Sequence, residues 1–485
     1  MKDTAYPFPQ RVANWIKYRV FICDILRKTR YFPMSRPLKS SLKADEIIFP
    51  KNGVKRRRFF KRILALVLLA ILFSCVGTMV VPEIWPYFGA QVANHMRNLI
   101  GPQAVAQIEA IVFQVQDTVK HWQYQYGVEQ AEAPWGSSAI PLELTPFSQV
   151  SIEKSSLTPE STRLTPTPPA AIETPAYMEQ SKEPQDQLPV KAGSPTPTPT
   201  PYVWQLSTLI PFGSMEGEGV WLPYLNDREG HVVAMRTFLQ PDPERPYAIV
   251  AVVAFDLTRT QLHFVLGFNE PSLPDGPKGD GLISEEDREA GVLLAAFNGG
   301  FRAANGQFGA MADGIVALPP KSEMATVGIY RSGEVRIGIW GEEINDTPDL
   351  QAWRQNCRLI IQDGEISPRV YNNSITDWGG SISNQIVTRR SSLGLDREAK
   401  TLYYFAGPSL SMSVLANAIL AAGVQDGMLL DINHFWVLFT AIHSEEGKLV
   451  AEPLLPNDMI DHIDRYLGPS PADFFYITIW DSRQP

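Results

Sequence analysis

The C-terminal part of the chain predicts an α+β fold that is rich in antiparallel or mixed sheet. Three observations lead to this fold class: many short β-type runs follow residue 205, helical periodicity is rare among them, and strands do not alternate regularly with helices. The predicted strands are 232–238, 248–257, 261–268, 292–297, 326–330, 335–340, 358–362, 392–395, 401–405, 428–432, 436–441 and 474–480.

Turn and capping signals place further boundaries within this part of the chain. Residues 331–334 and 396–400 each separate two predicted strands and predict hairpin turns. Residues 411–422 form an amphipathic helix, with Ser411 as its N-cap and Gly423 at its end. We therefore expect a sheet-rich domain with this helix as its main helical element.

Charge is distributed unevenly along the chain. The formal net charge is −9, but residues 1–62 hold 17 Lys or Arg against 4 Asp or Glu, a balance of +13 that leaves −22 for the remainder. A basic start and an acidic remainder indicate two compartments rather than a nucleic-acid-binding protein.

Residues 63–81 predict a transmembrane helix. This run of 19 residues has no charged side chain, and at 1.5 Å per residue it reaches roughly 28 Å, close to the ~30 Å hydrocarbon core of a bilayer. Basic residues directly before it place residues 1–62 in the cytoplasm and the rest outside, as in a single-pass cell-membrane protein. Lipid is the partner expected for this helix. A buried core helix is the alternative interpretation.

The predicted extracytoplasmic part has three segments. Residues 82–133 predict a juxtamembrane helical stalk, interrupted at Gly101-Pro102. Residues 134–204 are rich in Pro, Ser and Thr and predict a disordered spacer between the anchor and the domain at 205–485. Cysteine and histidine spacing indicates no metal site, and no cofactor is expected.

The turn after the strand predicted at 292–297 is the strongest signal of a binding site. Asn298 places an amide at the strand end, and Gly299 and Gly300 allow another backbone or a ligand to come close. Polar groups on a glycine turn at a strand end often form small-molecule sites. A tight turn without a ligand is the alternative interpretation.

Several motifs in order resemble the phosphodiester glycosidase family. The resemblance covers roughly residues 206–483, and its anchor is the Asn-Gly-Gly-Phe element within AAFNGGF. The further matching pieces are Leu359 to Glu365, Arg390 to Asp396, Ser411 to Gly423, and Leu430-Asp431. The resemblance implies hydrolysis of a sugar-1-phosphodiester on surface glycans or exopolysaccharide.

Each candidate residue has a functional and a structural interpretation. For the implied reaction, the arginine fork of Arg390 suits phosphate oxygens, and Asp431 is the carboxylate expected near the anomeric carbon. His434 is a candidate proton donor or phosphate ligand because its ordinary pKa lies near neutrality. Asp363 and Asn433 are candidate substrate contacts, with Asn298, Gly299 and Gly300. In the structural interpretation, Arg390 and Asp431 form an ion pair, His434 is a packing residue and Asp363 only completes a turn.

The chain departs from the family after Asp431. Ile432, Asn433, His434, Phe435 and Trp436 replace a glycine-rich loop whose backbone N–H groups could bind sugar or anion oxygens. Three hypotheses remain: a faithful phosphodiester glycosidase, a catalytically inactive glycan-binding or cell-envelope protein, and an enzyme in which Asn433 and His434 replace the loop. In each case we expect Asn298, Arg390 and Asp431 to line one cleft, with the glycine pair as its floor.

Overall fold

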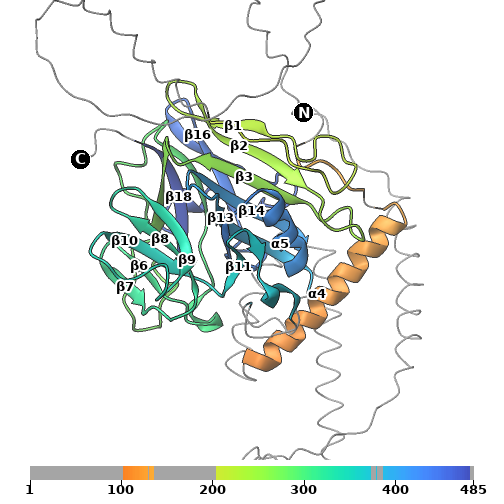
Figure 1. Cartoon of the computed structure of the whole chain (residues 1–485), viewed down its shortest axis with the longest axis horizontal. Coiled ribbons are helices and arrows are strands. Elements are labelled where there is room, and N and C mark those ends of the chain that lie inside the picture. The colour runs from red at the N-terminus through yellow and green to blue at the C-terminus, as the bar shows by residue number, and fades with distance from the viewer. Residues whose placement is uncertain (1–101, 129, 136–203, 373–377, 379–385, 481–485) are drawn as a thin grey trace, which may run out of the picture. The chain divides into compact units, whose positions relative to one another are not determined.

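The computed structural model describes residues 102–128, 130–135, 204–372, 378 and 386–480 (Figure 1). The predicted cytoplasmic arm, the transmembrane helix at 63–81 and residues 136–203 of the spacer lie outside these residues. Within the described residues, no helix has both the length and the hydropathy that crossing a bilayer requires.

Antiparallel sheets make up most of the described part, with few helices, which agrees with the predicted sheet-rich class. The largest sheet has eight strands in the order β1-β2-β3-β14-β13-β15-β11-β12. Its strands are β1 (Leu222–Asn226), β2 (Val232–Leu239), β3 (Val250–Asp256), β11 (Leu359–Gln362), β12 (Glu365–Ile366), β13 (Thr388–Leu395), β14 (Thr401–Leu410) and β15 (Asp426–Leu429).

Two five-stranded sheets complete the domain. Their orders are β17-β16-β5-β18-β4 and β7-β6-β10-β8-β9. The strands of the first are β4 (Thr260–Val265), β5 (Leu293–Asn298), β16 (Phe439–Glu445), β17 (Lys448–Pro453) and β18 (Phe474–Ile479), and those of the second are β6 (Ala310–Ala312), β7 (Ile315–Leu318), β8 (Ala325–Tyr330), β9 (Val335–Ile339) and β10 (Leu350–Gln355).

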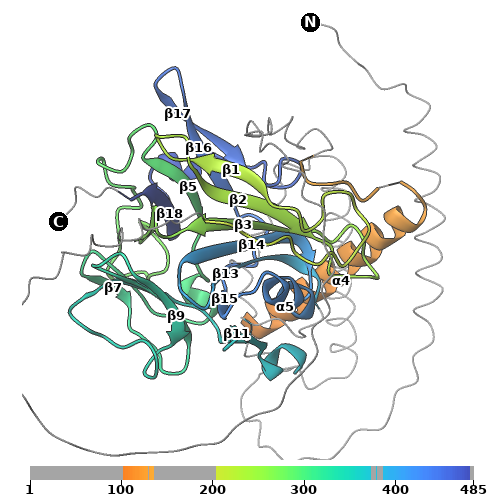
Figure 2. The same cartoon turned by 45° about the horizontal axis from the view of Figure 1, so that its top comes forward.

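The eight-stranded sheet is covered on both faces. Side chains alternate along β3, so that Ala251, Val253 and Phe255 join the core shared with β5, β16 and β18. Val250 and Val252 join the opposite core, which includes α5 (Met412–Ala421). Figure 2 shows α5 beside β14 and β11. Burial on both faces explains why β3 is apolar from Val250 to Phe255 instead of alternating with polar residues.

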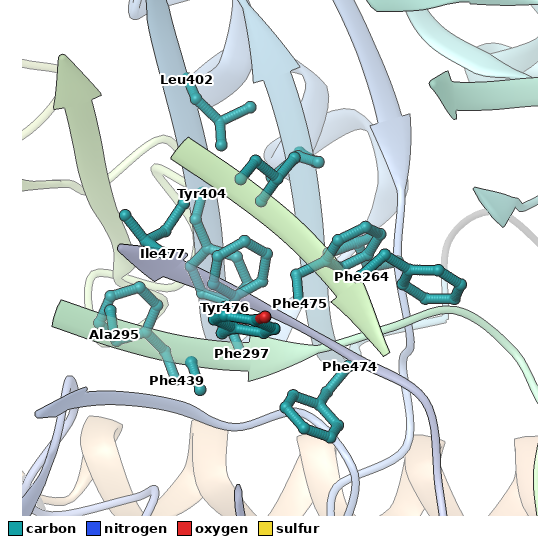
Figure 3. Close-up of a cluster of buried hydrophobic side chains, with 14 of the residues drawn as sticks. Phe264, Ala295, Phe297, Leu402, Tyr404, Phe439, Phe474, Phe475, Tyr476 and Ile477 are labelled. Carbon is teal, nitrogen blue, oxygen red and sulfur yellow. The ribbon is translucent and has the colours of Figure 1, made fainter. Parts of the chain in front are cut away.

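The core between the eight-stranded sheet and the sheet β17-β16-β5-β18-β4 is aromatic (Figure 3). Phe297 lies at its centre, with ring centroids 4.9 Å from Tyr404, 5.6 Å from Phe475 and 5.9 Å from Phe439. These rings come from β5, β14, β18 and β16. Because β5 ends one residue later, this packing fixes where Asn298 and the glycine turn emerge.

Most predicted elements are present, with shifted boundaries. The predicted helix is α5, and Ser411 Oγ accepts a hydrogen bond from Val414 N as its N-cap. β13 begins at Thr388, four residues before the prediction, because two arginines interrupt the apolar pattern there. β15 ends before the predicted residue 432 because the chain turns after Asp431. The short or edge strands β1, β6, β7, β12 and β17 were not predicted, and neither was β10 in the middle of its sheet. The described residues also include three short 3-10 helices: η2 (Ala303–Asn305), η3 (Pro368–Tyr371) and η4 (Arg465–Leu467).

The predicted juxtamembrane stalk includes a helix that contacts the domain. This helix is α4 (Pro102–Gln125), which begins where the sequence predicts the second stalk helix. Arg245 Nε and Nη2, between β2 and β3, donate to the two carboxylate oxygens of Asp117 at 2.9 and 2.8 Å. The rings of Tyr124 and Tyr247 are 5.5 Å apart. A bidentate pair with both partners mostly buried is stronger than an exposed one.

Two tryptophans at the borders of the Pro-rich segment also contact the domain. Trp135 Nε1 donates to Leu454 O at 2.7 Å, and the Arg236 guanidinium carbon lies 4.5 Å from the Trp135 ring centroid. Trp204 Nε1 donates to Thr401 Oγ1 at 3.3 Å. The residues that flank 136–203 on either side therefore pack against the domain.

Replacing Phe297 with Ala should lower the free energy of unfolding by about 3–5 kcal/mol, because it leaves a cavity among three aromatic rings. Urea denaturation of both proteins measures this. Ile315→Ala removes an apolar side chain that is 36% exposed on β7 and should change the same quantity by less than about 1 kcal/mol. Equal losses for the two variants would contradict a central role for Phe297.

Candidate functional site

Strand ends and connecting loops enclose a small pocket. Its volume is about 220 Å³, including its open side. Asn298 and the glycine pair reach it from the end of β5, and Asp431 reaches it from beyond β15. The complete lining is Asn298, Gly299, Gly300, Asp431, Trp436, Tyr466, Ser470, Ala472 and Asp473.

Asn298 is buried and joins two sheets. Its Nδ2 donates to Gly299 O and to Ser391 Oγ of β13, both at 2.9 Å, and its Oδ1 accepts from the Tyr404 hydroxyl at 2.9 Å. Ser391 Oγ donates in turn to Asp431 O at 2.9 Å. Both N–H groups of the amide are used inside the protein. Asn298 therefore positions the Asp431 backbone instead of offering donors to a ligand.

The glycine pair allows a buried ion pair to approach the backbone. Gly299 N donates to Asp473 O at 3.0 Å, and Gly300 N donates to Asp473 Oδ2 at 3.1 Å. Arg354 Nε of β10 donates to the same carboxylate oxygen at 2.7 Å. A Cβ on Gly299 would collide with Asp473 Oδ2, and one on Gly300 would lie 2.9 Å from the guanidinium carbon of Arg354. Close approach is thus the reason for two adjacent glycines.

Asp431 is a buried carboxylate, and none of the described residues places a cation at contact distance from it. Its Oδ1 accepts from Ile432 N at 2.7 Å and Asn433 N at 2.8 Å. Desolvation by burial raises the pKa of Asp431 to about 7, the two backbone hydrogen bonds oppose this, the nearby Asp473 adds to it, and Arg302 lowers the pKa. Asp431 can therefore exchange a proton near neutral pH.

Aromatic side chains form another wall of the pocket. Trp436 follows Asp431 in the loop, with its ring centroid 4.9 Å from that of Phe435 in an edge-on arrangement. The guanidinium carbon of Arg465 lies 4.6 Å from the Phe435 ring centroid. Tyr466 of η4 stacks on Phe474 at 4.7 Å. These contacts hold the two pocket-lining rings without any glycine in the loop.

Arg390 does not line the pocket, which corrects the prediction from sequence. It is fully buried on the α5 side of β13, where its Nε donates to Leu410 O at 2.8 Å. Burial lowers the pKa of Arg390 to about 10, so it stays charged at pH 7. Because side chains alternate along a strand, Ser391 faces Asn298 and Arg390 faces away. The expected ion pair with Asp431 is not formed.

His434 also lies outside the pocket lining. It is exposed, and its carbonyl accepts from Arg389 Nη1 at 2.7 Å, while Arg389 Nη2 pairs with Asp458 Oδ2 at 2.6 Å. Desolvation and the Arg389 guanidinium both lower the pKa of His434 below its ordinary value. Solvent access weakens the first effect, whereas Arg389 Nη2 stays 3.4 Å from His434 Nε2. The ring is neutral at pH 7 and is not an acid for the pocket.

Asp363 is a turn residue, as its structural interpretation predicts, and Asn433 also takes part in a turn instead of lining the pocket. Asn433 Oδ1 accepts from Phe435 N at 2.9 Å and caps its own loop. Asp363 is exposed between β11 and β12 with a φ of 53°, and its N donates to Asp426 Oδ1 at 3.1 Å. Asp426 begins β15, whereas Asp431 follows the end of that strand. Neither Asn433 nor Asp363 lines the pocket.

Asp473 is the main site residue that was not identified from sequence. It directly precedes the apolar strand β18, and it is buried. An aspartate beside an apolar strand is costly to bury unless it is paired, which is the same signal that indicated Asp431. The sequence pattern at Asp473 carries this signal, but its reason, the ion pair with Arg354 of another sheet, is visible only in the structure. Tyr466, Ser470 and Ala472 carried no comparable pattern.

A separate group of possible metal ligands lies in the turn between β1 and β2. Asp227, Glu229 and His231 have potential ligand atoms within 4.8 Å of one another. Arg259 Nη1 already lies 3.0 Å from Asp227 Oδ2 and 3.2 Å from His231 Nδ1. The Arg259 guanidinium pairs with these acidic groups and disfavours the binding of a metal cation beside it.

The fold and the pocket define a class of protein: a sheet-rich α+β domain in which strand ends bring two buried carboxylates to one pocket. No family model matches the chain, and no curated protein sequence matches it.

Comparison with solved structures gives weak resemblances only. One is to the catalytic domain of zebrafish N-acetylglucosamine-1-phosphodiester alpha-N-acetylglucosaminidase, auto-inhibited by its pro-peptide, at 14% identity and a TM-score of 0.31, covering 53% of this chain and 86% of that one. Another is to a hypothetical protein from Synechocystis, at 10% identity and a TM-score of 0.29, covering 54% and 62%. These values do not assign the chain to a family.

Gly299→Ala should destabilise the protein by about 1–3 kcal/mol, because the added Cβ must displace the buried Asp473 carboxylate. Chemical denaturation measures the change. Gly468→Ala is the matched control, since a Cβ there meets nothing within 4 Å and its φ of −126° suits any residue. Equal stability of Gly299→Ala and the native protein would show that the turn does not need the close approach.

Asp431→Asn should remove a pH dependence of stability. The pKa of Asp431 is raised from 3.8 to about 7 in the folded state, so between these values the folded protein holds a proton that the unfolded chain has released. The free energy of unfolding therefore falls as pH rises from about 4 to 7, by at most roughly 4 kcal/mol from this group. The neutral amide of the variant does not titrate, so the variant lacks this loss of stability. Urea denaturation from pH 4 to 8 should show the native protein losing stability relative to Asp431→Asn, and parallel curves would contradict the raised pKa.

Proposed function

We propose that this pocket hydrolyses the glycosidic bond of a sugar-1-phosphodiester. One observation carries the proposal: Asp431 and Asp473 line the same small pocket in different electrostatic surroundings. Asp473 is paired with Arg354, whereas Asp431 is desolvated and its pKa is near 7. Two carboxylates with separate environments can take separate roles in glycoside hydrolysis.

The surroundings suggest a role for each carboxylate. Asp431 can donate or accept a proton at neutral pH, as a general acid or base requires. Asp473 is held by Arg354 Nε and Gly300 N, so it is suited to stabilise positive charge that develops at the anomeric carbon. A phosphodiester leaves as a stable anion, which reduces the need for a strong acid.

An anionic leaving group also fits the charge beside the pocket. Arg302 follows the glycine turn, acts electrostatically on Asp431 and is 25% exposed. Its Nε donates to Glu270 Oε1 at 2.9 Å, which fixes the guanidinium. In this proposal Arg302 takes over the phosphate role that the sequence suggested for Arg390. The sequence motifs that resemble phosphodiester glycosidases support the same substrate class.

The proposed setting is outside the cell membrane, with a surface glycan or exopolysaccharide as the partner. Support for this comes from the sequence: the uncharged run at 63–81 and the basic residues before it. The same segment would provide the contact with membrane lipid.

A catalytically inactive glycan-binding protein is the second candidate. The observation that favours it is the position of Asn433 and His434, which do not line the pocket and therefore do not replace the donors of a glycine loop. Under this alternative, Asp431 and Asp473 accept hydrogen bonds from sugar hydroxyl groups without chemistry.

Asp431→Asn should reduce the rate of hydrolysis about 10²–10⁴-fold on a panel of sugar-1-phosphodiesters, because the amide cannot transfer the proton. Release of free sugar measures the rate. Asp346→Asn, an exposed site between β9 and β10, is the control and should retain full activity. Asp473→Asn should also be inactive, but it leaves Arg354 buried without its counter-ion and needs a folding check.

Retained activity in Asp431→Asn would refute the catalytic role. Absence of sugar release from every phosphodiester by the native protein, together with measurable glycan binding, would establish the binding-protein alternative instead.

A further inference from the structure

One face of helix α4 is attached to the domain. Asp117 of this helix accepts the two hydrogen bonds from Arg245. The Tyr124 ring lies 5.5 Å from that of Tyr247, and Lys120 Nζ lies 5.4 Å from the Tyr247 ring centroid. Residues three, four or seven apart share a face of an α-helix, so Asp117, Lys120 and Tyr124 form one continuous stripe. We call this stripe the attached face.

Apolar residues of α4 lie away from the attached face. Ile111 is 52% exposed and Val115 is 38% exposed. Val115 precedes Asp117 by two residues, which corresponds to a rotation of about 200° around the helix axis. Single exposed apolar side chains are ordinary on protein surfaces, whereas a regular series of them on one helix indicates a contact surface.

The apolar residues of α4 have the spacing of a coiled coil. In a coiled coil seven positions, a to g, repeat along the helix, and positions a and d meet another helix. Three consecutive heptads fit α4, with the a and d positions at Val105, Ile108, Val112, Val115, Val119 and Trp122.

The same numbering separates the coiled-coil face from the attached face. It places Asp117 and Tyr124 at position f and Lys120 at position b, on the outer side of a coiled coil. One helix can therefore hold the domain through positions b and f while positions a and d meet other helices. Domains attached in this way would extend outward from the coiled coil without colliding in its centre.

Charge favours an identical helix over a lipid surface as the occupant of this face. Residues 102–125 contain two acidic residues, Glu109 and Asp117, and one basic residue, Lys120, which gives a net charge of −1 with His121 neutral. Helices that rest on anionic lipid carry Lys and Arg on their polar face. In a parallel pair, each position e faces a position g of the other helix, and the g positions are the uncharged Ala104, Ile111, Thr118 and Gln125. Copies of α4 would therefore meet without repulsion between like charges.

We propose that α4 assembles with α4 of two other copies of this chain in a parallel coiled coil. The β-branched residues at both a and d of the first two heptads favour three strands over two. The helices are parallel because the predicted membrane segment precedes α4 in every copy. This interface goes beyond the proposed hydrolysis and does not depend on it.

Cysteine cross-linking in the full chain tests the parallel arrangement. Val115→Cys, at position d, brings the same residue of two copies together in a parallel coiled coil, so mild oxidation should double the chain mass on a non-reducing gel. Gln114→Cys, at the exposed position c, is the matched control and should not cross-link. The native chain, which contains Cys23, Cys75 and Cys357, gives the background.

A charge in the coiled-coil face tests its contribution to assembly. Val115→Asp should raise the concentration at which half of the chains are assembled by at least about 100-fold, because each copy would bury a carboxylate without a partner. Gln114→Asp adds the same charge at position c and should assemble normally. Sedimentation velocity of the full chain in detergent measures the assembly. Equal thermal unfolding of the two variants, both monomeric and compared at low concentration, would show that Val115→Asp leaves the domain folded.

A native protein that stays monomeric, or an assembly that Val115→Asp leaves intact, would overturn the proposal. Cross-linking at Gln114→Cys as strong as at Val115→Cys would also overturn it, since it would show collision without a defined seam. Hydrolysis is not measured in any of these experiments, so failure of the proposed function would leave their outcome unchanged.

Discussion

The buried ion pair between Arg354 and Asp473 constrains the rest of the pocket. Arg354 belongs to β10 and Asp473 precedes β18, so their 2.7 Å contact joins two sheets. Arg354 also donates to the carbonyls of Phe301 and Phe308, which leaves little of its charge unpartnered. Such a pair is stable only when its remaining hydrogen bonds are satisfied. The turn after β5 must therefore pass close to this ion pair, and only glycine is small enough for that approach.

The sequence predicted the parts of the site that local pattern encodes. A polar residue with two glycines after an apolar run located the turn at Asn298, and an aspartate at the end of another run located Asp431. It could not tell which side chains of β13 face Asn298, because the strand begins four residues before its apolar pattern does. The prediction that Arg390 lines the pocket was therefore wrong. Asp473 was missed because its partner is distant in sequence.

The loop after Asp431 keeps backbone N–H donors but directs them to a different acceptor. In a glycine-rich loop we expected N–H groups to be offered to a ligand. Here Ile432 N and Asn433 N donate to the Asp431 carboxylate itself. These bonds stabilise the ionised form and so limit how far burial can raise its pKa. The loop thus adjusts the acidity of the residue it follows, while its Trp436 lines the pocket.

The contacts of Trp135 and Trp204 change the role that can be assigned to the Pro-rich segment. Both indoles donate to the same sheet-rich body, at Leu454 O and Thr401 Oγ1, so the chain is attached to that body on both sides of residues 136–203. The number of residues between these two attachment points therefore does not set how far the domain stands from the residues before α4. A single peptide-bond cleavage within residues 136–203 would yield two chains that remain associated through the contacts of α4 and Trp135.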